Sequence, residues 1–203
     1  MEIPALYAVF RGGSIMTGQV TYTGGKMTLD ERLQAARDMF REFDERTDVV
    51  VVDVRGLNRR NMDDILLMEM IIPGSDIWYL THVKDIEDIF DGFMGDVSKI
   101  MIPYHTVRNK MVLKEIYDVS DSCIPVLFSS VYDLDGMISG LANVFRIGYA
   151  EAVVYDIDDV VSEGDWTILK SKFDNVMPHV RNRSRIEMLR SLGYDRIIVD
   201  HQF

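Results

Sequence analysis

The sequence predicts an α/β fold, a TIM-type (β/α)8 barrel. Short runs of β-branched residues alternate with amphipathic stretches along all 203 residues. The runs are apolar almost throughout, which is typical of parallel strands covered on both faces. A sequence pattern also recurs about halfway along the chain, as expected for a barrel built from two similar halves. We expect a single domain over residues 1–203, because no linker interrupts the alternation.

Eight strands and seven helices are expected in alternation. The strands are predicted at 5–10, 49–53, 76–80, 98–102, 124–128, 152–156, 175–178 and 196–200. Thr28 followed by Glu31 forms a capping box that predicts the first helix, and Asn61 with Asp64 predicts the start of the second. Gly193 is expected to end the last helix. Strands that alternate with helices imply right-handed crossovers and a parallel sheet.

An internal repeat favours a closed barrel over an open sheet. His82-Val83-Lys84 recurs 97 residues later as His179-Val180-Arg181, and each copy opens a helix that leads to an apolar strand. The third and fourth strand–helix units therefore resemble the seventh and eighth. The alternative, an open doubly wound sheet, favours a G-x-G-x-x-G turn after the first strand, and Arg11-Gly12-Gly13 does not match it.

The end of the chain predicts how the barrel closes. The last strand is expected to end near Asp200, and the chain stops at Phe203, so the barrel is expected to lack its last helix. The apolar outer faces of the first and last strands would then be exposed. Because exposed apolar patches are rare in monomers, we expect a homodimer through this seam. In the alternative, residues 18–28 fold back over the seam.

The composition excludes several classes of protein. The net charge of −11 argues against nucleic-acid binding, because the average field repels a polyanion. No apolar run approaches the roughly 18 residues that a membrane span needs. The single cysteine, Cys123, and the absence of a signal-like N-terminal segment predict a cytoplasmic location.

Several short motifs resemble the histidine-biosynthesis isomerase and cyclase family, HisA and HisF. They are Ile3-Pro4-Ala5 with Arg11-Gly12-Gly13, the second-strand run Val50-Val51-Val52-Asp53, and the helix start at 83–88. The resemblance implies a barrel with two catalytic carboxylates, at the ends of strands one and five. It also implies glycine-rich phosphate-binding turns after strands three and seven.

The departures from that family pattern change the expected chemistry. Aligned on Arg11-Gly12-Gly13, the first acid is replaced by Val9, which has no proton to transfer. The second falls at Ser130 or Tyr132, depending on where the gap is placed, and Asp133 is close enough to replace it. Leu80-Thr81-His82 and Met177-Pro178-His179 occupy the two turns, where side chains hinder backbone contacts with phosphate. We therefore expect no isomerisation of the histidine-pathway substrate.

Polar residues at strand ends supply the candidate site, because catalytic residues of such barrels gather at the carboxyl ends of the strands. All four histidines fall at or just after predicted strands, and imidazoles with carboxylates suit acid–base chemistry. The predicted catalytic residues are His82, His179, Asp53, Asp156 and Asp133. The predicted substrate-binding residues are Arg11, Lys84, Arg181, His105, His201 and Ser130. No H-x-H or H-x-x-x-H spacing indicates a metal site, and we expect no cofactor.

The resulting functional hypothesis is a diverged barrel enzyme that acts on a small anionic metabolite, such as a phosphorylated one. The histidines and aspartates would transfer protons, and Arg11, Lys84 and Arg181 would hold the anion. The alternative is a catalytically silent barrel that serves as a binding or assembly protein. The loss of the acid at Val9 and of the glycine turns favours that alternative.

Overall fold

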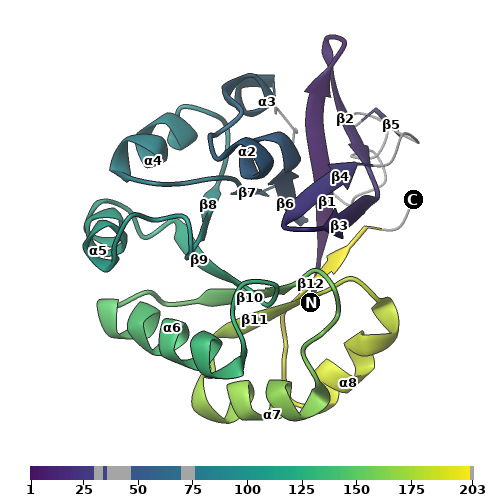
Figure 1. Cartoon of the computed structure of the whole chain (residues 1–203), viewed down its shortest axis with the longest axis vertical. Helices are drawn as coiled ribbons and strands as arrows, with labels where there is room; N and C mark the ends of the chain where they lie inside the picture. The colour runs from purple at the N-terminus through teal and green to yellow at the C-terminus, as the bar shows by residue number, and fades with distance from the viewer. Residues whose placement is uncertain (30–33, 36–46, 70–75, 202–203) are drawn as a thin grey trace.

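The computed structural model describes residues 1–29, 34–35, 47–69 and 76–201. Eight parallel strands form a closed ring in the order β1-β6-β7-β8-β9-β10-β11-β12, and β12 pairs again with β1. The fold is therefore the predicted TIM-type barrel, with helices around the outside of the ring (Figure 1). The ring strands are β1 (Glu2–Arg11), β6 (Asp48–Asp53), β7 (Asp76–Leu80), β8 (Lys99–Pro103), β9 (Cys123–Phe128), β10 (Ala152–Asp156), β11 (Val176–Val180) and β12 (Ile197–Asp200).

The described helices follow the ring strands from β6 to β11. They are α2 (Val54–Arg59), α3 (Asp64–Glu69), α4 (Ile86–Phe93), α5 (Lys110–Val119), α6 (Leu134–Ile147), α7 (Glu163–Lys172), the short 3-10 helix η1 (Arg183–Arg185) and α8 (Ile186–Ser191). Gly193 follows α8 with a φ of 86°, as expected for a glycine that ends a helix. Helix α2 was not predicted. It begins because the Asp53 side chain accepts a hydrogen bond from Gly56 N.

The first predicted helix is wrong at its start. Thr28 and Leu29 belong to strand β4 (Lys26–Leu29), which pairs antiparallel with β3 (Val20–Thr23). Gly24 and Gly25 make the turn between them with φ values of 59° and 79°. The rest of that predicted helix, at 30–33 and 36–46, lies outside the described residues. Two further strands, β2 (Ser14–Gly18) and β5 (Gln34–Ala35), extend the sheet beyond β1.

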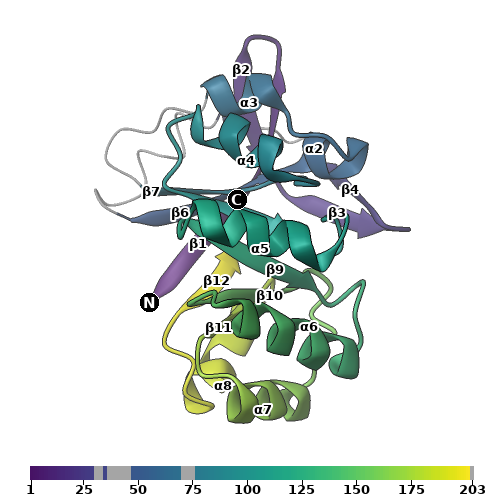
Figure 2. The same cartoon turned by 90° about the vertical axis from the view of Figure 1, so that its left-hand side faces the viewer.

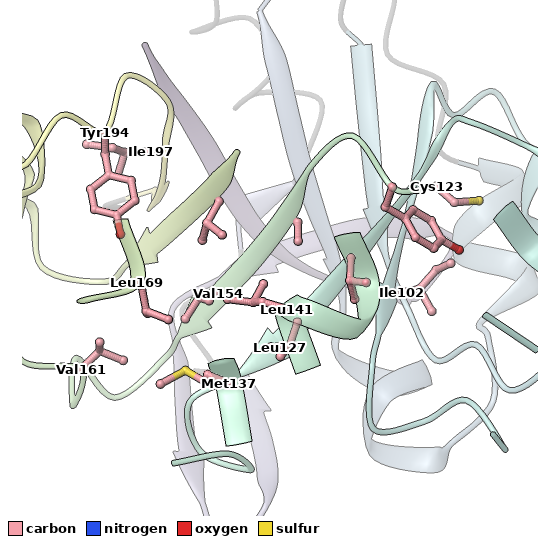
Figure 3. Packing of buried hydrophobic residues seen from close by; sticks show 14 of the residues in the cluster. Ile102, Cys123, Leu127, Met137, Leu141, Val154, Val161, Leu169, Tyr194 and Ile197 are labelled. Carbon is pink, nitrogen blue, oxygen red and sulfur yellow. The ribbon is translucent and has the colours of Figure 1, made fainter. Parts of the chain in front are cut away.

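Alternate residues of each strand face opposite sides of the barrel wall. Val50 and Val52 face the interior, where they join a core with Trp78, Tyr155 and Ile198. The opposite faces pack against the surrounding helices (Figures 2 and 3). Residues of this outer core include Ile102, Leu127, Leu141, Val154, Leu169 and Ile197. Nearly every strand residue is therefore buried, which explains the continuous apolar runs.

The seam between β1 and β12 differs from its prediction. The outward-facing Leu6 and Ala8 of β1 and Ile197 and Val199 of β12 are all at most 1% exposed. The wide apolar patch that motivated the homodimer is thus absent from these strands. Residues 18–28 do not cover the seam either, since Val20 and Met27 pack on the interior core. The predicted loss of the last helix concerns residues after Asp200, of which only His201 is described.

Candidate functional site

The β3–β4 hairpin, with its turn at Gly24-Gly25, lies over the barrel interior. Val20 and Met27 are 2% and 5% exposed and contact the interior core. Asn58, in the last turn of α2, binds the hairpin as a neighbouring strand would: its Oδ1 accepts from Met27 N (2.9 Å), and its Nδ2 donates to Met27 O (2.6 Å). Figures 1 and 2 show β4 beside α2. The hairpin therefore covers part of the face where the strands end.

A cavity of about 460 Å³, which we call the histidine cavity, opens beside this hairpin. His82 and His105 both line it, and each follows its strand, β7 or β8, by two residues. Because these strands are neighbours, they bring the two imidazoles to the same side of the barrel mouth. The remaining lining residues are Tyr22, Gly25, Met27, Leu57, Asn58, Arg60, Thr106, Phe128 and Val131.

Both imidazoles of the histidine cavity resist protonation. Burial lowers the pKa of His82, and the charges of Lys84 and Arg60 lower it further, while Asp88 opposes them. Partial desolvation also lowers the pKa of His105, with contributions from His82 and Arg60, although its side chain keeps contact with solvent. A neutral imidazole offers one N–H donor and one acceptor nitrogen. No carboxylate is among the described lining residues, so this part of the cavity suits an anionic ligand.

Arg60 is a site residue that the sequence analysis missed. It ends helix α2 in the left-handed conformation, with φ 58° and ψ 41°, and its N–H donates to Gly56 O. Glycine is the usual residue at such a position, and a side chain there costs on the order of 1 kcal/mol. Among the described residues, no carboxylate forms an ion pair with Arg60. The sequence had shown Arg55, Arg59 and Arg60 together, with nothing to single out the one that lines the cavity.

His179 lies on the opposite side of the barrel in a different environment. Strands β7 and β11 are four positions apart in the ring of eight, so His82 and His179 lie on opposite strands, as predicted. However, His179 is fully buried, its Nε2 is 2.7 Å from Asp200 Oδ1, and its ring stacks on Tyr155 at 3.6 Å. Tyr7 OH donates to the same Asp200 oxygen at 2.9 Å. The prediction that His179 faces the open mouth is therefore wrong, because the residue lies in the interior core.

A second, smaller cavity lies above this buried group, and we call it the Asp200 cavity. Its volume is about 100 Å³, and it is lined by Tyr7, Gln19, Val20, Arg181, Asp200 and His201. Arg181 donates to Val20 O of the hairpin at 2.5 Å, and its Nε is 3.9 Å from Asp200 Oδ2. The Arg181 side chain thus already has two protein partners, the Val20 carbonyl and the Asp200 carboxylate.

Asp53 and Asp156, both predicted to be catalytic, are fully buried structural residues. Asp53 accepts from Gly56 N, Asp63 N, Tyr79 OH and Thr81 Oγ1, at 2.7 to 3.0 Å. Asp156 accepts from Ser129 Oγ, Val160 N, Val161 N and Arg185 NH1, at 2.7 to 3.1 Å. Both carboxylates face outward from the barrel wall, because they alternate with the inward-facing Val52 and Tyr155. Neither lines the histidine cavity or the Asp200 cavity.

The other predicted residues lie at the edges of the mouth. Asp133 caps α6 by accepting from Gly136 N, and Lys84 pairs with Asp88 at 3.8 Å. Ser130 donates to Tyr22 OH at 3.3 Å, beside the histidine cavity. Arg11 is exposed at the end of β1 and lines neither cavity. Among the described residues, no group of three or more histidine, cysteine, aspartate or glutamate side chains is placed to hold a metal ion.

The lowered histidine pKa values predict a pH dependence of stability. The unfolded chain binds protons at the ordinary histidine pKa of 6.5, and the folded chain binds them only at lower pH. Stability is therefore fully present above that value and falls as the pH drops through it. We expect the wild type to lose more thermal stability between about pH 7.5 and pH 5.5 than a His82→Gln/His105→Gln variant. Thermal unfolding followed by circular dichroism checks this, and equal losses would contradict it.

Comparison with known proteins supports the fold and shows no family. No protein-family model and no curated protein matches the chain. Among solved structures, the HMG-CoA lyase of Bacillus subtilis has a TM-score of 0.61 at 10% identity, over 79% of this chain and 66% of the lyase. The carboxyl transferase domain of Rhizobium etli pyruvate carboxylase has a TM-score of 0.45 at 12% identity, over 63% of this chain and 28% of that one.

The match to the lyase shows a shared fold and nothing further. This chain spans a little under two thirds of the lyase's length, and 10% identity carries no information about activity. Neither solved structure belongs to the HisA and HisF family, so that relationship is not shown. Within the described residues, no helix is long and apolar enough to cross a lipid bilayer. The chain thus has a TIM-barrel fold, of the kind that the lyase shares.

Proposed function

We propose that this protein is a barrel enzyme that performs acid–base chemistry on a small anionic metabolite in the histidine cavity. One observation carries the proposal: two imidazoles whose pKa values are lowered face the same cavity beside an arginine without an ion-pair partner in the described chain. A lowered pKa keeps an imidazole neutral at pH 7, in the form that accepts a proton as a general base, and groups with shifted pKa values gather at functional sites. The barrel fold places this cavity where the active sites of TIM-barrel enzymes lie.

Each side chain has a defined part in this proposal. Arg60 holds the anionic group through charge-assisted hydrogen bonds. One imidazole accepts a proton from a substrate carbon, and the N–H of the other donates a hydrogen bond to the neighbouring carbonyl oxygen, which stabilises the enolate that forms. Asp53 and Asp156 take no part, because four protein donors already surround each of them. Val9 stands at the position of the family's first acid and has no proton to transfer. In this proposal the histidines therefore perform the proton transfer.

A relationship to HisA and HisF remains part of the proposal. The two-fold repeat of His82-Val83-Lys84 and the Arg11-Gly12-Gly13 turn support it, and a barrel fold is compatible with it. The proposed chemistry differs from that family's, because the described cavity offers imidazoles instead of paired carboxylates. We further propose a cytoplasmic location, on the ground that the chain has a single cysteine. That cysteine, Cys123, is buried, and burial raises its pKa to about 12, so its thiol resists reaction.

The ligand-binding part of the proposal is tested by NMR of the four histidines. In protein labelled at histidine, the ring signals of His82, His105, His179 and His201 are few enough to assign by single substitutions to glutamine. We expect inorganic phosphate to shift the signals of His82 and His105 in a saturable way and to leave that of buried His179 unchanged. Binding should strengthen as the pH falls, because protonation adds positive charge to the cavity. Phosphate that shifts neither His82 nor His105 would refute the site.

The catalytic part is tested by proton exchange. Small monophosphorylated sugars and carboxylated ketones would be incubated with the protein in D₂O, and deuterium incorporation beside the carbonyl would be followed by NMR. We expect incorporation with the ligands that shift His82 and His105, and a loss of about 10²- to 10⁴-fold in rate in the His82→Gln variant. Ligand binding without any exchange would instead favour the alternative, a silent barrel that serves as a binding protein.

A further inference from the structure

The sequence repeat gives each half of the barrel mouth a similar segment. His82-Val83-Lys84 after β7 and His179-Val180-Arg181 at β11 lie on strands opposite each other in the ring. In a symmetric barrel both histidines would face an open mouth, and two anionic groups of one ligand would have two equivalent places. In the described part of the chain, the cavity beside His82 has instead a volume of about 460 Å³, and the one beside Asp200 a volume of about 100 Å³.

A difference in register between the halves explains why the second half is closed. His179 lies within β11, opposite Tyr155 of β10, whereas Leu80 is the residue of β7 opposite Val52, and His82 follows two residues later. Asp200 therefore binds His179 Nε2, and Tyr155 stacks on the same ring. Tyr155 OH also donates to Tyr7 OH at 2.9 Å, which links the stack back to Asp200. His82 lies beyond the end of β7, where it lines the histidine cavity.

The β3–β4 hairpin divides the mouth between the halves. Its first residue, Val20, lines the Asp200 cavity and accepts a hydrogen bond from Arg181. Tyr22, Gly25 and Met27 of the same hairpin line the histidine cavity. Since Val20 and Met27 are both buried in the interior core, the hairpin is anchored between the two cavities. A ligand in the histidine cavity consequently meets the hairpin before it reaches Arg181.

We infer that the ligand carries a single anionic group, that Arg60 binds it, and that the opposite half of the mouth is structural. This inference rests on the proposed function and names the class of its substrate: a monoanionic or monophosphorylated metabolite, in contrast to one with phosphates at both ends. Of the two cations, Arg60 lines the histidine cavity without an ion-pair partner in the described chain. Arg181 already binds Val20 O and lies 3.9 Å from Asp200, whose negative charge repels an anion.

The backbone of Arg60 supports this assignment. An arginine with φ 58° occupies a position that glycine fills without strain. Its exposed side chain forms no described ion pair that would offset the free-energy cost of this backbone conformation. Strain of this kind persists at functional sites. Replacing Arg60 by glycine should therefore stabilise the fold while it removes the anion contact. If the Arg60 side chain instead stabilised the fold, the substitution by glycine would lower the melting temperature.

The experiment compares Arg60→Gly with Arg181→Gln, a matched loss of positive charge on the opposite side of the mouth. Glutamine at 181 keeps a side-chain donor for Val20 O. Inorganic phosphate, ribose 5-phosphate and ribulose 1,5-bisphosphate serve as probes in calorimetric titrations. We expect one phosphate per chain, and a bisphosphate that binds no more than about threefold tighter than the monophosphate. Arg60→Gly should weaken binding about 10- to 100-fold and raise the melting temperature by about 2–4 °C, whereas Arg181→Gln should change affinity less than about twofold.

The outcomes separate this inference from the proposed function. Two phosphates per chain, or a bisphosphate that binds more than about tenfold tighter and needs both arginines, would overturn the inference and leave the proposed site intact. An Arg60→Gly variant that binds phosphate with unchanged affinity would also overturn the inference. The proposed site would stay intact in that case, provided that phosphate still shifts the NMR signals of His82 and His105. No phosphate effect on either histidine would overturn the proposed function, and this inference with it.

Discussion

Replacing Asp53 with alanine is expected to lower the free energy of unfolding by about 3–5 kcal/mol, which corresponds to a melting temperature lower by on the order of 10 °C. The Asp53 carboxylate is fully buried and accepts hydrogen bonds from two backbone N–H groups and two hydroxyls. The substitution leaves all four donors unsatisfied in the interior, and each unsatisfied donor costs about 1–3 kcal/mol before relaxation. Urea unfolding followed by circular dichroism measures the loss.

Asp133→Ala is the matched control for Asp53→Ala. Asp133 also accepts a hydrogen bond at a helix start, from Gly136 N of α6, but its side chain is exposed. Loss of such a cap costs about 1 kcal/mol, because water replaces the missing acceptor. Equal losses for the two variants would show that Asp53 is not the buried acceptor described here. Phosphate binding at His82 and His105 should survive both substitutions, since neither aspartate lines the histidine cavity.

Replacing Asp200 with alanine is expected to have a comparable effect, again about 3–5 kcal/mol. Asp200 Oδ1 is 2.7 Å from His179 Nε2 and accepts from Tyr7 OH at 2.9 Å. Both partners are buried, so each is left with a polar group that lacks its protein acceptor. Burial raises the pKa of Tyr7 and of Tyr155 well above their ordinary values, so neither phenol replaces the lost negative charge.

Two readouts distinguish this structural role from a catalytic one. Thermal unfolding of Asp200→Ala should show the large loss, while Asp158→Ala, at an exposed position in the loop after β10, should stay within about 0.5 kcal/mol of the wild type. The folded Asp200→Ala protein should still bind phosphate through the histidine cavity. If it unfolds like the wild type, or if phosphate no longer shifts His82 and His105, the division between a structural and a functional half is wrong.

Local sequence patterns predicted most of the barrel. Runs such as Val49–Asp53 and Ala152–Asp156 are apolar on both faces, and only strands between an inner core and a helix layer meet that requirement. The repeat around His82 and His179 placed the two on opposite strands, because four strand–helix units separate them. These features depend on neighbours along the chain, so the sequence by itself determines them.

The hairpin and the roles of the polar residues depended on contacts between distant segments. Thr28 and Glu31 matched a helix start, but Thr28 pairs with Thr21 in a hairpin that Asn58 and the interior core hold in place. Capping boxes are local signals that tertiary packing overrides. Arg60 was one of three arginines after β6, and only the fold shows which one lines the histidine cavity.

The tertiary structure also decided which strand-end residues are free for chemistry. His82 and His179 share their local sequence, yet His179 lies within β11, where Asp200 and Tyr155 contact it, whereas His82 lies two residues past the end of β7 and lines the histidine cavity. Asp53 carries the same carboxylate that a catalytic acid would, but its orientation toward the helices commits it to four donors. A polar group is available to a ligand only when no buried partner already satisfies it, and those partners come from strands and loops far away in the sequence.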